Sequence, residues 1–93
     1  MMISDHPLHV LIVDDEDIVH TTLGSFISAT GHHVYDARDG NQGLAAIETR
    51  SYDLALVDVR MPGMDGIELL ARARQIRPET SDNYIVMFDE WAS

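Results

Sequence analysis

The chain has 93 residues, of which 45% are hydrophobic and 24% charged, so it forms at most one small globular domain and is not disordered. Sixteen Asp and Glu residues against six Arg and no Lys give a net charge of -10, which argues against direct contact with nucleic acid or an anionic membrane. The sequence has no Cys, no secretory segment and no apolar run that could span a bilayer, and we expect a cytoplasmic location without disulfides or thiolate metal sites.

The first half of the chain predicts two strand–helix units. Residues 10–13, Val-Leu-Ile-Val, are apolar on both faces, which is typical of a strand buried in a parallel sheet. Four apolar residues then recur at helical spacing, and a glycine follows where such a helix would end: Val19, Leu23, Phe26, Ile27 and Gly31. Residues 33–35 predict a short strand, residues 39–40 (Asp-Gly) a turn, and residues 44–50 a short helix.

The second half repeats the alternation. Residues 54–57, Leu-Ala-Leu-Val, predict a third strand, and residues 61–64, Met-Pro-Gly-Met, predict a loop with packed methionines. Asp65 followed by Glu68 resembles a capping box, and it opens a helix that ends at Pro78. We expect its apolar face to be formed by Ile67, Leu70 and Ala73, flanked by Leu69 and Ile76. Residues 84–88 predict a fourth strand, so the order βαβαβαβ indicates an α/β fold with an open parallel sheet.

Acidic residues follow two of these strands. Asp14 and Asp15 come directly after the first strand and Asp58 after the third. If the two strands are neighbours, the three carboxylates converge, and each close pair costs about 4 kcal/mol at an effective dielectric constant of about 20. Hard oxygen ligands of this kind suit Mg²⁺. Alternatively, the acids after the first strand only cap the helix that follows, and spacing alone does not decide between these hypotheses.

Two longer motifs carry a resemblance. Residues 10–16, VLIVDDE, and residues 52–66, YDLALVDVRMPGMDG, resemble the receiver domain of bacterial response regulators. The resemblance covers residues 8–88 and implies a flavodoxin-like sheet of strand order 2-1-3-4. It identifies residues 1–93 as a single incomplete receiver domain, truncated before the family's fourth helix, fifth strand and fifth helix. It implies a two-component signalling protein, not an enzyme, that takes a phosphoryl group from a histidine kinase or a phosphotransfer protein.

The resemblance also implies roles for individual residues. Asp58 matches the phosphoacceptor of the family. Asp14 and Asp15 match the acidic pair that holds Mg²⁺, with Asp15 as a direct ligand and Asp14 acting mostly through water. Asp58 and the main-chain carbonyl of Arg60 match the other protein ligands. The implied reaction is therefore a Mg²⁺-dependent phosphorylation of Asp58.

The sequence departs from the family at two positions. Asp89 stands where the family has a Ser or Thr that contacts the phosphoryl group, and it would add negative charge there; the alternative is that Asp89 belongs to a solvated chain end. The family's lysine is missing, because the sequence contains no Lys. The Arg60 side chain is a possible substitute cation, although we expect it to lie over the rim of the site.

The missing elements lead to an expectation about assembly. Without them the fourth strand is an edge of the sheet, and one sheet face is covered by a single helix. We therefore expect a homo-oligomer, formed through the edge of the fourth strand or through the uncovered face. The alternative is an accidental truncation that is only marginally folded.

Two other function classes compete with phosphoacceptance. A pseudo-receiver, which binds partner proteins without phosphorylation, is favoured by the missing Lys and by Asp89 in place of the Ser or Thr. It is opposed by the intact Asp14, Asp15 and Asp58. A Mg²⁺-dependent hydrolase with an Asp nucleophile is disfavoured, because Arg60 stands where a general acid is expected. The histidines are scattered, and no spacing among them predicts a metal site. We expect His32 and His33 to be a surface pair.

Overall fold

A computed structural model describes residues 6–78 and 85–88 of the chain. Within these ranges, strands and helices alternate in the predicted order: β1 (His9–Val13), α1 (Asp17–Ala29), β2 (His33–Ala37), α2 (Gly40–Thr49), β3 (Leu54–Asp58), α3 (Gly66–Ile76) and β4 (Ile85–Phe88). Of the expected fourth strand, Tyr84 lies outside the described residues.

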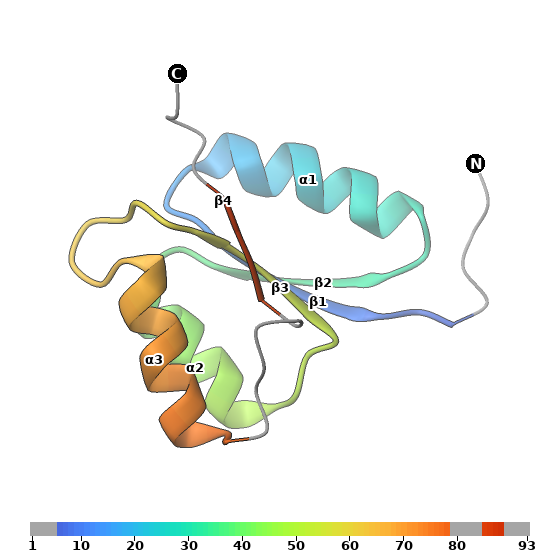
Figure 1. The fold of residues 1–93 in the computed structure, drawn as a ribbon. Helices are drawn as coiled ribbons and strands as arrows, with labels where there is room; N and C mark the ends of the chain where they lie inside the picture. Colours follow the sequence, from blue (N-terminus) through green and yellow to red (C-terminus); the bar gives the residue numbers. More distant parts are fainter. Residues whose placement is uncertain (1–5, 79–84, 89–93) are drawn as a thin grey trace.

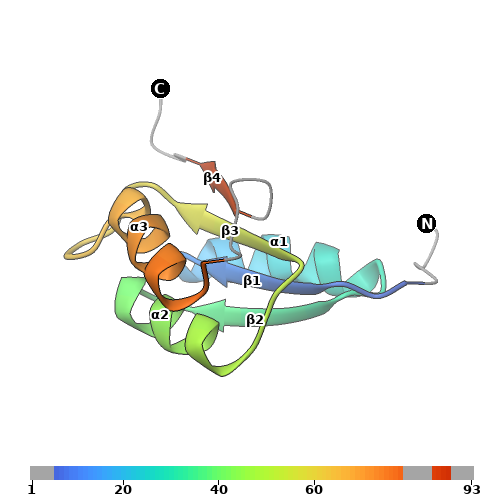
Figure 2. The ribbon, with the colours of Figure 1, turned by 60° about the horizontal axis from the view of Figure 1, so that its bottom comes forward.

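The four strands form one parallel sheet of order β2-β1-β3-β4, as predicted. Figure 1 shows α1 on one face of this sheet and α2 with α3 on the other. The view in Figure 2 shows β1 between β2 and β3, with β4 beyond β3. Val13 of β1 is paired in register with Val57 of β3, so these two strands end side by side at the same edge of the sheet. This placement is what the acidic residues need in order to meet.

The main core lies between the sheet and the α2–α3 layer. Leu11, Val13 and Val57 of the two central strands are at most 1% exposed and pack with Leu69 and other apolar residues into one cluster. Fully burying a side chain of this size contributes about 1.5–3 kcal/mol, so this face supplies much of the stabilisation. Met61 is buried and Met64 packs against the same cluster, which confirms the expected packing role of both methionines.

Helix ends confirm one prediction and correct two others. Gly31 has φ 96° and follows α1, where its N–H and that of His32 donate to Ser28 and Ile27. Asp39 does more than form a turn, because it is the N-cap of α2 and its side chain accepts from the Gln42 N–H. The helix therefore begins at Gly40 and not at residue 44.

The capping box of α3 forms only in part. Asp65 caps the helix by accepting from the Glu68 N–H at 2.8 Å, as the motif predicts. The Glu68 carboxylate pairs with Arg72, one turn further along the helix, at 2.8 Å. The cap therefore fixes the start of α3 through the aspartate.

The predicted core faces of α1 and α3 were partly wrong. In α1, Phe26 is 61% exposed, whereas the polar His20 is buried. In α3, Ile67 is 60% exposed, and Leu69 with Ala73 faces the core. Periodicity reveals an apolar stripe but not its rotation about the helix axis, which is set by contacts that are distant in sequence.

Two smaller observations complete the fold. Among the described residues, no helix is long and apolar enough to cross a membrane. His33 is exposed at the start of β2, as expected, but His32 is only half-exposed, and its Nδ1 accepts from the Leu8 N–H at 2.9 Å.

Candidate phosphoacceptor and metal site

The structure brings the three predicted acids together. Asp58 is the last residue of β3, and Asp14 and Asp15 follow the end of the neighbouring strand β1. Each of the three offers a carboxylate oxygen, and these oxygens all lie within 4.8 Å of one another. The expected convergence is therefore confirmed, and helix capping alone does not account for it.

Asp14 is held at several points but keeps one oxygen without a partner. The residue is 0% exposed; its N–H donates to the Ala37 carbonyl at 3.1 Å, and its Oδ1 accepts from the Glu16 N–H at 2.8 Å. Its buried Oδ2 has no hydrogen-bond partner among the described residues. Burial raises the pKa of the Asp14 carboxyl, and the nearby Asp15 charge adds to that rise, against the opposing effects of the Glu16 N–H and His20.

Asp58 is oriented by the loop that follows it. It is 0% exposed, and its Oδ1 accepts from the Arg60 N–H at 3.0 Å. The loop then returns to the strand, where the Gly66 N–H donates to the Val59 carbonyl at 3.1 Å. A Cβ at Gly66 would lie 2.8 Å from the Asp58 carbonyl oxygen, so only glycine fits this close approach.

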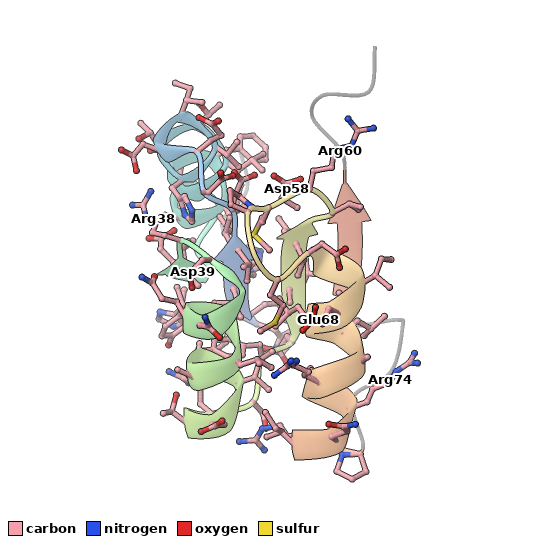
Figure 3. The ribbon with its side chains drawn as sticks, turned by 90° about the vertical axis from the view of Figure 1, so that its left-hand side faces the viewer. Arg38, Asp39, Asp58, Arg60, Glu68 and Arg74 are labelled. Atoms are coloured by element: carbon pink, nitrogen blue, oxygen red, sulfur yellow. The ribbon has the colours of Figure 1, made fainter. Side chains whose placement is uncertain are left out.

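The remaining predicted positions differ in how far the structure describes them. Asp15 and Arg60 are both exposed, and Figure 3 shows Arg60 at the same end of the molecule as Asp58. Arg38 lies on the opposite side of Asp58 in this view and forms an ion pair with Asp17 in the first turn of α1. Asp89 lies outside the described residues.

Two residues near the site were missed by sequence reasoning. His20 is buried in α1, and its ring nitrogens contact the Asp14 carbonyl and the carboxylate of Asp36. The sequence of α1 gives only a weak sign that the polar His20 is buried. Its partners Asp14 and Asp36 lie six and sixteen positions away. No local sequence motif connects His20 with Asp14 and Asp36.

The donor set fits a hard divalent cation. Asp14 and Asp58 are buried, Asp15 is exposed, and all three carboxylates meet at the open end of two strands. The unpartnered Oδ2 of Asp14 is a buried acceptor that bound Mg²⁺, or water of its hydration shell, would satisfy. Such an ion would also offset the mutual repulsion of the carboxylates. These residues therefore fit Mg²⁺.

Comparisons with known proteins agree with this geometry. A family model for the response regulator receiver domain matches residues 10–90. The chain is 42% identical over 67 residues to the gliding motility regulatory protein of Myxococcus xanthus, a match that covers 72% of this chain and 9% of that protein. The chain thus spans less than a tenth of that relative.

Solved structures show the same fold. A receiver domain protein (CheY-like) from Methanospirillum hungatei JF-1 superposes with a TM-score of 0.82 at 33% identity, over 95% of this chain and 68% of that one. The response regulator TrrA from Thermotoga maritima, solved in complex with Mg(2+)-BeF, gives a TM-score of 0.79 at 25% identity, over 90% of this chain and 70% of that one. Both similarities extend over nearly all of the sheet and helices described above.

Proposed function

Because the chain belongs to the response regulator receiver domain family, we propose that Asp58 accepts a phosphoryl group from a histidine kinase or a phosphotransfer protein. The observation that carries this proposal is the meeting of Asp14 and Asp15 with Asp58 at one edge of the sheet. An isolated buried carboxylate has no such neighbours. A phosphoacceptor needs them, because a bound cation must offset the charge that gathers there.

The chemistry follows from the position of Asp58. A carboxylate oxygen of Asp58 attacks the phosphorus of the donor phosphohistidine, and a phosphorus–oxygen bond forms as the phosphorus–nitrogen bond breaks. The electron pair returns to the donor imidazole, which takes up a proton from solvent. The Arg60 N–H on Oδ1 orients the carboxylate for this attack. Water later hydrolyses the acyl phosphate and restores Asp58.

The proposed metal ligands are Asp14, Asp15, Asp58 and the main-chain carbonyl of Arg60. Bound Mg²⁺ supplies charge neutralisation for the phosphoryl oxygens. TrrA, a relative of similar fold, was solved with Mg(2+)-BeF, which supports a magnesium-dependent site in this chain.

The direct test is phosphorylation by a small donor. The protein is incubated with Mg²⁺ and acetyl phosphate, and its intact mass is measured. We expect a single phosphoryl adduct that is stable in acid, lost in base and absent in Asp58→Asn. Asp53→Asn, which changes the aspartate directly before the start of β3, is the matched control and should be labelled normally. An adduct that persists in Asp58→Asn would contradict the assignment.

A pseudo-receiver is the second candidate, because the sequence contains no Lys to match the family's lysine. In that case the fold would act as a protein-binding module that needs no phosphate. The same mass measurement separates the two: Mg²⁺ binding without any adduct, at donor concentrations that label a complete receiver domain, favours the module.

Self-association is a further part of the proposal. Within the described residues β4 pairs only with β3, and its Val86 is 48% exposed. An apolar edge strand is a template for pairing with a second copy. We expect sedimentation velocity at micromolar concentration to reveal a dimer that Val86→Lys weakens, with Glu48→Lys on α2 as the control. A monomer under these conditions would contradict this part.

A further inference from the structure

His20 connects three elements behind the acidic site. Its side chain is only 4% exposed; Nε2 lies 2.7 Å from the carbonyl oxygen of Asp14, and Nδ1 lies 2.6 Å from Oδ1 of Asp36. His20 belongs to α1 and Asp36 to β2, and Asp14 directly follows the end of β1. The imidazole therefore spans the junction of the first helix and the first two strands.

The chemistry of these atoms fixes the direction of the hydrogen bonds. A carbonyl oxygen can only accept, so Nε2 carries a proton and donates it to Asp14. Nδ1 lies at hydrogen-bond distance from the Asp36 carboxylate, which fixes the other side of the ring. Both ring nitrogens are thus engaged, and the ring cannot rotate without losing a bond at each end.

These bonds complete the fixation of Asp14. Ala37 holds its N–H, Glu16 holds its Oδ1, and His20 holds its carbonyl, which leaves the buried Oδ2 as the free acceptor. The main-chain N–H of Glu16 and the side chain of His20 both belong to the segment that follows β1, whereas the main-chain carbonyl of Ala37 belongs to β2. His20 is the only one of the three that reaches Asp14 through a side chain, so it is the one that substitution can remove cleanly.

We infer that His20 is a positioning residue for the acidic site: it clamps the main chain of Asp14 so that Oδ2 faces the cation, and Asp36 holds the imidazole in place. This inference rests on the proposed magnesium site. A partner that orients a metal ligand typically changes metal affinity by about 10- to 100-fold when it is removed.

Two amide substitutions separate positioning from packing. The amide nitrogen of Gln can occupy the place of Nε2, whereas that of Asn can only occupy the place of Nδ1. We expect His20→Asn to weaken Mg²⁺ binding about 10-fold and His20→Gln to keep affinity close to the wild type. Affinity is measured by isothermal titration calorimetry, and the thermal midpoint is recorded without Mg²⁺ for every variant.

The measurements distinguish a failure of the proposed function from a failure of the inference about His20. If the wild type binds no Mg²⁺, the proposed function fails. If it binds and the two amide variants have equal affinity, weakened or not, His20 acts through packing and this inference alone is overturned. Should His20→Asn not fold, Asp36→Ala tests the same clamp from a half-exposed position. Its effect must exceed that of Glu48→Ala, which removes an equal charge from the exposed surface of α2.

Discussion

The two ends of the sheet are built on opposite principles. At the carboxyl end, three acids meet, and the buried Oδ2 of Asp14 has no partner among the described residues. At the amino end, polar and aromatic side chains of opposite character contact one another, although the buried Nε of Arg50 has no hydrogen-bond partner among the described residues. His9 Nδ1 lies 2.9 Å from the Tyr35 hydroxyl, and Arg50 reaches both residues from the end of α2.

The amino end gains in addition from aromatic packing. The Arg50 guanidinium lies 4.5 Å from the centre of the Tyr35 ring, and the rings of Tyr35 and Tyr52 meet edge to face at 5.3 Å. The His9 ring stacks on that of His33 at 4.9 Å. The positive charge of Arg50 therefore lies against a hydroxyl, an imidazole nitrogen and an aromatic ring, all of which stabilise it.

The contrast separates stability from function. A cluster that only stabilises the fold places a cation against hydrogen-bond acceptors and an aromatic ring, as Arg50 is placed at the amino end. A cluster that leaves like charges close together is unfavourable without a ligand, as the carboxyl end is, and is retained where a ligand repays the cost. Substitutions at the two ends should therefore change the free energy of unfolding in opposite directions.

The largest effect is expected at the amino end. Arg50→Ala removes the hydrogen bonds to Tyr35 and His9 and the cation–π contact, so we expect it to lower the free energy of unfolding by about 2 kcal/mol. Because the cluster lies at the far end of the sheet, the affinity for Mg²⁺ should not change. Urea denaturation and calorimetric titration measure the two quantities.

Arg72→Ala is the matched control for that substitution. It makes the same change on the exposed surface of α3, where Arg72 pairs with Glu68 one turn away. Such a pair contributes only about 0.3–0.5 kcal/mol. Equal losses from the two arginine variants would show that the amino-end cluster adds nothing beyond a surface ion pair.

Most of the fold was predictable because it depends on local patterns. The apolar runs that became β1 and β3, the aspartate that caps α3 and the glycine after α1 each carry their meaning within a few residues. The meeting of Asp14 and Asp58 was predictable as well, since parallel strands end at the same edge.

The missed start of α2 was a local signal, the cap that Asp39 gives to the Gln42 N–H, whereas the other failures come from contacts between residues distant in sequence. In α1 the buried His20 contacts Asp36 of β2, sixteen positions away, whereas Phe26 lies in solvent. The amino-end cluster joins His9 to Arg50, which are 41 positions apart. Periodicity and motif spacing carry no information about such pairs.

The smaller effect is expected at the carboxyl end and has the opposite sign. Asp14→Asn keeps an oxygen to accept from Glu16 and replaces the buried Oδ2 by an amide that can donate to the neighbouring carboxylates. We expect the Mg²⁺-free variant to be more stable than the wild type by about 1 kcal/mol at neutral pH, and its Mg²⁺ affinity to fall by at least about 10-fold. Asp65→Asn is the control, since Asn and Asp cap helices equally well.

The pH dependence of this difference follows from the pKa of Asp14. Burial raises that pKa in the folded protein, so between the ordinary aspartate value and the raised value the folded state binds more protons than the unfolded state. Acidification through this window therefore stabilises the wild type at Asp14, whereas Asn has no proton to bind. The advantage of Asp14→Asn should shrink as the pH falls from 7 toward the ordinary aspartate range. An advantage that stays constant across this range in parallel urea titrations would mean that an ionised, desolvated Asp14 is not what destabilises this end of the sheet.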